Sequence, residues 1–130
     1  MDKELLKQNI ENAFANFKAA IAPHENINTK RADGGWSVGE TGNHIVKSTG
    51  VDFGATQSTE RPYDKHAAAI KKLFLNYTIK FPADPSLWPD TKHYSGDEIF
   101  TSLDKNKLAV FKMISNEDLT KTCTDIELPV

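Results

Sequence analysis

The amino-acid sequence predicts a single all-α domain that covers residues 1–130. Three observations support this prediction: apolar residues recur at steps of three and four, capping sequences precede two such segments, and no pair of strands is evident. A chain of 130 residues fits one domain, because domains are most often ~100 to 150 residues long. The hydrophobic fraction of 38% is that of a globular protein with one core.

The first helix is expected over Lys3–Ala22. One side of this helix is apolar and the other carries lysine and glutamate side chains, which is the pattern of an amphipathic helix. Pro23 ends this helix, because a proline displaces the residue before it from helical geometry. The apolar face consists of Leu6, Ile10, Ala13, Phe14, Phe17 and Ile21.

The second helix is expected over Ser37–Ala55 and begins with a capping box, in which Ser37 and Glu40 satisfy each other's backbone N–H groups. This segment is rich in glycine, and each glycine in a helix interior costs about 1 kcal/mol relative to alanine. Two explanations remain open. Either another backbone or a ligand comes close to this helix, or its second half is frayed or broken.

Two further helices are expected, over Asp64–Lys80 and Gly96–Ile114, joined by a crossover with three prolines at Phe81–Pro89. Ser95 caps the last of them. Helical periodicity predicts that the following side chains are buried: Phe14, Phe17, Trp36, Ile45, Phe74, Phe100 and Phe111.

Charge and cysteine content exclude several classes of function. Sixteen basic and eighteen acidic residues give a net charge of −2 without a basic cluster, which argues against nucleic-acid binding. No apolar run approaches the ~18 residues of a membrane span, so no membrane partner is expected. A single cysteine, Cys123, and a charged start predict a cytoplasmic protein, in which this thiol is a bystander.

The histidines carry no strong metal motif, because no two have the i, i+3 or i, i+4 spacing of ligands on one helix. His24, His66 and His93 are interpreted as solvated or capping side chains. His44 differs, because Ser48 and Val51 follow it at positions that would leave room for a ligand. Taken by itself, a lone helical histidine is more often a hydrogen-bonded structural residue.

The stretch from Trp36 to Lys47 resembles the beginning of the second helix of the DinB/YfiT-like metalloenzymes. The shared pattern is Trp-Ser/Thr, two residues, Glu, three residues, His and an apolar residue. The resemblance implies a four-helix bundle that holds Zn, Ni or Fe through one histidine on the second helix and a His-x-x-x-His pair on the last. His44 matches the first ligand. The proline-rich crossover and the approach Asp125–Val130 also agree with the family in order.

The sequence departs from the family because it stops where the last helix and its paired histidines would begin. His44 is therefore the sole metal ligand that can be named, and this chain alone is expected to bind divalent metal weakly or not at all. We expect its imidazole to point into the bundle and to open on a pocket beside the second helix.

The resemblance implies a metal-dependent thiol S-transferase or hydrolase that acts on a small-molecule substrate or thiol. The alternative is a metal-free, stress-associated helical bundle that binds a ligand or another protein. A bundle short of one helix would expose an apolar groove that a second copy could fill, so a homodimer is expected.

Overall fold

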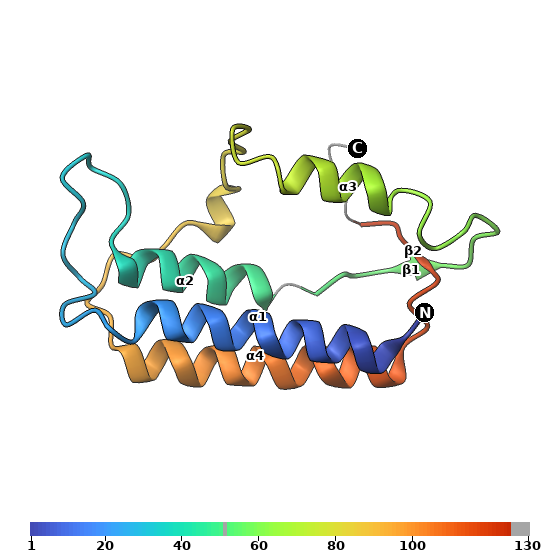
Figure 1. Ribbon diagram of the computed structural model, residues 1–130, viewed down its shortest axis with the longest axis horizontal. Helices are drawn as coiled ribbons and strands as arrows, with labels where there is room; N and C mark the ends of the chain where they lie inside the picture. Colours follow the sequence, from blue (N-terminus) through green and yellow to red (C-terminus); the bar gives the residue numbers. More distant parts are fainter. Residues whose placement is uncertain (51, 126–130) are drawn as a thin grey trace. The chain divides into compact units, whose positions relative to one another are not determined.

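A computed structural model describes residues 1–50 and 52–125. The contacts group them into two compact units (Figure 1), one made of residues 1–50 and 84–116 and the other of residues 52–83 and 117–125. The described part is mostly helical, as predicted, and the single-domain expectation stays a prediction. None of the described helices is both long and apolar enough to cross a membrane.

The first unit contains three α-helices and one short 3₁₀ turn. These are α1 (Lys3–Ile21), α2 (Val38–Thr49), η1 (Pro85–Leu87) and α4 (Gly96–Asn116). The long helix α4 packs against both α1 and α2. Asp2 caps α1 by accepting a hydrogen bond from the backbone of Leu5 at 3.0 Å. The boundaries predicted for the first and last helices are thus right to within two residues.

The core of this unit lies where the chain leaving α1 meets the start of α4. Its buried members are Ile21, Ile27, Tyr94, Ile99 and Leu103. The predicted residues Phe14, Phe17, Ile45 and Phe100 are half-buried and pack against this core, and Phe111 is also half-buried. Aliphatic side chains therefore occupy the centre, with the phenylalanines around it.

The burial predicted for Trp36 and Phe74 is wrong. Trp36 is 36% exposed, because it precedes the capping box and its ring lies against His44 instead of the core. Phe74 is 49% exposed and lies in the second unit, where no described residue is buried. Its ring centroid is 5.9 Å from that of Phe81.

The capping box of α2 is present as predicted. The Ser37 hydroxyl accepts from the backbone N–H of Glu40 at 3.1 Å, and the Glu40 carboxylate accepts from the backbone N–H of Ser37 at 3.0 Å. Ser37 is buried, and Lys30 pairs with Glu40 at 2.6 Å. Because Ser37 is buried, its hydroxyl and not water accepts the hydrogen bond of the free backbone N–H of Glu40.

The glycines of this segment divide between the two explanations. Gly39 donates its backbone N–H to the carbonyl of Ile27 at 2.7 Å, and both Gly39 and Gly42 are buried. A Cβ atom on Gly42 would lie 2.9 Å from the side chain of Ile99. Close approach therefore accounts for the first two glycines, whereas the helix ends at Thr49 and the predicted continuation to residue 55 is wrong.

The second unit contains α3 (Ala67–Phe74) and two short antiparallel strands, β1 (Thr56–Gln57) and β2 (Thr122–Cys123). The sequence predicts no paired strands, and this prediction is wrong for these four residues. The third helix is much shorter than predicted. It stops near Asn76, whose side-chain oxygen accepts from the backbone and hydroxyl of Thr78 at 3.2 and 2.6 Å, a local turn that competes with helix.

Candidate functional site around His44

His44 lies in the middle of α2 and is half-buried. Its Nδ1 atom is 2.8 Å from the carbonyl oxygen of Leu87, which is 43 residues further along the chain. Its ring centroid is 5.0 Å from that of Trp36, with an angle of 47° between the planes. Trp36 and Leu87 therefore hold the imidazole from two sides.

The partner carbonyl belongs to a segment that we call the strap, residues 84–90. Within the strap, Asp84 caps the 3₁₀ turn η1 and accepts from the backbone N–H of Ser86 at 2.9 Å. Prolines 85 and 89 restrict the backbone on both sides of Leu87. The strap is the observed form of the proline-rich crossover, and residues 85–87 form one helical turn there, where no helix is expected from the sequence.

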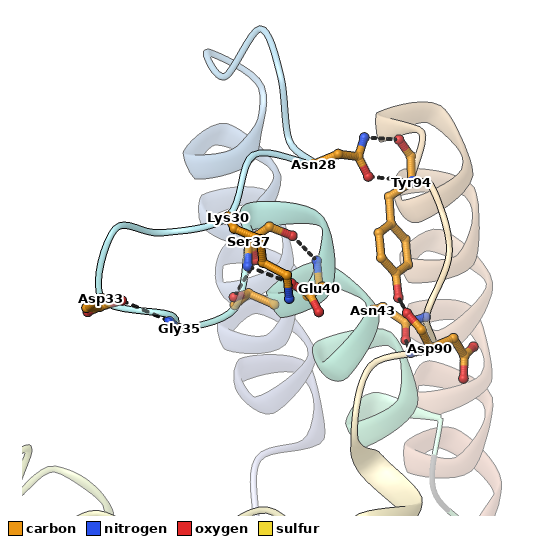
Figure 2. A network of polar contacts seen from close by, with 10 residues as sticks. Asn28, Lys30, Asp33, Gly35, Ser37, Glu40, Asn43, Asp90 and Tyr94 are labelled. Carbon is orange, nitrogen blue, oxygen red and sulfur yellow. Dashed lines mark hydrogen bonds and ion pairs between the residues drawn. The ribbon is translucent and has the colours of Figure 1, made fainter.

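Side chains of α2, together with Tyr94, form hydrogen bonds with the strap beside His44. Lys47 donates to the carbonyl of Trp88 at 2.7 Å and to the carboxylate of Asp90 at 2.8 Å. Asn43 accepts from the backbone N–H of Asp90 at 2.9 Å, and the hydroxyl of Tyr94 donates to the carbonyl of Asp90 (Figure 2). Polar contacts of the strap backbone and of Asp90 therefore attach the crossover to α2, and Trp88 itself is 55% exposed.

Electrostatics around the strap follow from these contacts. The hydrogen bond from Lys47 lowers the pKa of the Asp90 carboxyl below its ordinary value. Burial raises the pKa of the Tyr94 hydroxyl, so this group remains a hydrogen-bond donor at neutral pH. The strap is therefore bound to α2 through an ionised carboxylate, and the protonated phenol of Tyr94, just before α4, donates to the carbonyl of Asp90.

Ser48, one of the small neighbours of His44, has a local role. Its hydroxyl donates to the carbonyl of His44 at 2.8 Å. Val51 lies outside the described residues. The pocket expected beside His44 stays a prediction.

A cavity of about 610 Å³ lies elsewhere in the first unit, between the chain that leaves α1 and the start of α4. Sequence periodicity does not reveal it, because loop residues form much of its wall. Asn28 joins the two sides (Figure 2): its side chain donates to the carbonyl of Tyr94 at 2.9 Å and accepts from the Tyr94 N–H at 2.7 Å. The lining residues are Ile21, Ala22, His24, Glu25, Asn26, Ile27, Asn28, His93, Tyr94, Gly96, Asp97 and Phe100.

The structure does not gather the candidate ligands into one centre. In the described ranges, no three or more His, Cys, Asp or Glu side chains form a group that could hold a metal ion. His24 and His93 line the cavity, whereas His66 stands before α3 in the other unit. Cys123 is an exposed free thiol on β2.

Comparison with known protein families, curated proteins and solved structures finds no match to this chain.

Proposed function

We propose that this protein is a metal-dependent enzyme of the DinB/YfiT-like kind, in which His44 is one ligand of a divalent Zn, Ni or Fe ion. The contact between His44 and Leu87 is the observation that supports this proposal most strongly. A carbonyl oxygen can only accept, so the proton of the neutral imidazole is on Nδ1 and the lone pair is on Nε2. Histidines that bind metals commonly have this arrangement, in which one ring nitrogen donates to a backbone carbonyl.

One ligand does not make a metal centre. A catalytic zinc site usually takes three protein ligands, and the part of the chain that the structure describes brings no second or third group to His44. In this proposal the other ligands come from a helix with a His-x-x-x-His pair, as in the family that the chain resembles.

The reaction class rests on the family resemblance. It would be a thiol S-transfer or a hydrolysis with a small-molecule substrate, and the single cysteine suits a cytoplasmic location.

The cavity favours a second candidate function, that of a metal-free bundle that binds a ligand. Its floor includes the buried side chains Ile21, Ile27 and Tyr94, and its volume is within the usual range for small-molecule sites of ~300 to 1,000 Å³. His44 is not among its lining residues. Ligand binding there would therefore be independent of His44.

Calorimetric titration with Zn and Ni tests the first proposal. The chain as it stands should bind either ion weakly, because a single imidazole competes poorly with water. The same chain extended by a helix with two histidines one turn apart should bind tightly, and His44→Ala should abolish that binding. His66→Ala is the matched control and should leave it intact, since His66 lies in the other unit.

Two results would overturn the metal proposal. One is tight stoichiometric binding by the chain as it stands, and the other is unaltered binding by the extended His44→Ala variant. Binding of an apolar dye in the cavity that survives His44→Ala, together with no tight metal binding by the extended chain, would favour the metal-free function.

A further inference from the structure

We infer that Lys47 is a positioning residue that sets the protonation pattern of the His44 ring, through the strap. This inference rests on the proposed function in one respect: the protonation pattern matters because the ring nitrogen that lacks the proton is the one that can bind a metal. It does not rest on that function for its geometry, which consists of hydrogen bonds between α2 and residues 84–90.

The backbone carbonyl of Leu87 is the partner of the His44 ring. The turn η1 uses the backbone N–H groups of Leu87 and Trp88, which donate to residues 84 and 85 at 2.8 and 3.2 Å. The carbonyl of Leu87 itself is turned toward α2, where Nδ1 of His44 lies 2.8 Å away. The position of this one oxygen decides which ring nitrogen carries the proton.

Hydrogen bonds from Lys47 hold that oxygen in place. Lys47 donates to the next carbonyl along the chain, that of Trp88, and to the carboxylate of Asp90. It lies three residues after His44, so both side chains leave α2 on the same side. The side chain of Lys47 is 27% exposed, and its two bonds fix the strap on the C-terminal side of Leu87.

Loss of the two bonds from Lys47 would loosen the strap at Leu87. Asn43 and Tyr94 would still contact Asp90, so the strap would stay attached but could move at Leu87. The Nδ1 hydrogen bond would then form only part of the time. A neutral imidazole without a fixed partner exchanges between its two tautomers, so the lone pair would no longer be confined to Nε2.

The test is nitrogen-15 NMR of the histidine rings in the metal-free chain, at a pH above ~8, where imidazoles are neutral. In the unsubstituted chain, Nδ1 of His44 should carry the proton. Lys47→Ala should shift the tautomer ratio toward Nε2–H by roughly 2- to 10-fold, the change expected from weakening one hydrogen bond. Lys47→Arg should restore the original ratio, because arginine can also donate to both partners.

Matched variants separate positioning from a general loss of structure. Lys30→Ala removes the ion pair between Lys30 and Glu40, a residue of α2. Lys30 does not touch the strap, so the NMR signals of His44 should not move. Asp90→Ala removes one of the two partners of Lys47 and should cause a smaller shift in the same direction. It provides the same test if Lys47→Ala does not fold.

The inference is overturned if a folded Lys47→Ala or Asp90→Ala variant keeps the original tautomer ratio, or if His44 carries its proton on Nε2 in the unsubstituted chain. Since no metal is added, an unchanged ratio in the variants leaves the proposed metal function standing. Conversely, metal binding that ignores His44 would refute that function without affecting the tautomer result.

Discussion

Replacing Gly39 by alanine should destabilise the first unit, although alanine is the better helix former. A Cβ atom at this position would lie 2.9 Å from both Cβ and Cδ2 of Tyr94 and 3.0 Å from the carbonyl oxygen of Ile27. The same carbonyl accepts the N–H of Gly39 at 2.7 Å, so the two backbones cannot separate without breaking that bond. Tyr94 is only 3% exposed.

The magnitude follows from two opposing terms. Overpacking a filled site typically costs ~1 to 3 kcal/mol. Alanine in place of glycine returns at most ~1 kcal/mol, and less in the first turn of a helix, where Gly39 lies. The net loss should be about 1 to 2 kcal/mol. For a domain of ~60 to 100 residues, each kcal/mol lowers Tm by roughly 4 to 8 °C.

Gly96→Ala is the matched control, since Gly96 is also in the first turn of a helix but a Cβ atom there would have nothing within 4 Å. It should be neutral or stabilising by up to ~1 kcal/mol. Urea unfolding of both variants, followed by far-ultraviolet circular dichroism, measures the difference. If Gly39→Ala is as stable as the unsubstituted chain, the close approach of the two segments is not what requires glycine.

Two further predictions concern the core and the acid response. Leu103 is 1% exposed, so Leu103→Ala should lower the free energy of unfolding in urea by ~2 to 5 kcal/mol. Leu108 on the same helix is 65% exposed, so Leu108→Ala should cost less than ~0.5 kcal/mol. Equal losses would contradict the assigned core. The hydrogen bond from Lys18 lowers the pKa of Asp104, so the stabilisation is present above the unfolded pKa of ~3.9 and is lost as the pH falls through the lower folded pKa. Asp104→Asn should therefore reduce the fall in the urea midpoint between about pH 5 and pH 2, and an identical pH profile in the variant would refute this contribution.

Local signals predict the starts of α1 and α2 well, although not the end of α2. The caps at Asp2 and Ser37 use residues within a few positions along the chain, so the sequence displays both partners. The third helix is overestimated because the turn at Asn76 competes with a favourable apolar pattern. Periodicity also identifies a helix face without showing what covers it, which is why burial of Phe74 is predicted wrongly.

The surroundings of His44 could be predicted only in part. The stretch that begins at Trp36 indicates a distinctive histidine, and the structure places the two rings in contact. The partner of Nδ1 is a backbone carbonyl 43 residues away, and every residue type has such a carbonyl, so the sequence does not indicate this contact. Lys47 likewise looks like any solvated lysine, since its partners belong to the distant strap.

The discontinuous first unit also has a consequence for synthesis on the ribosome. Ile27 contributes to a core whose other half includes Ile99, and the strap that meets His44 is made between them. At ~5 to 20 residues per second, the roughly 70 residues between these two isoleucines take about 4 to 14 s to be made. Until then α1 and α2 have no α4 to pack against, so co-translational folding of this unit cannot finish before α4 has emerged.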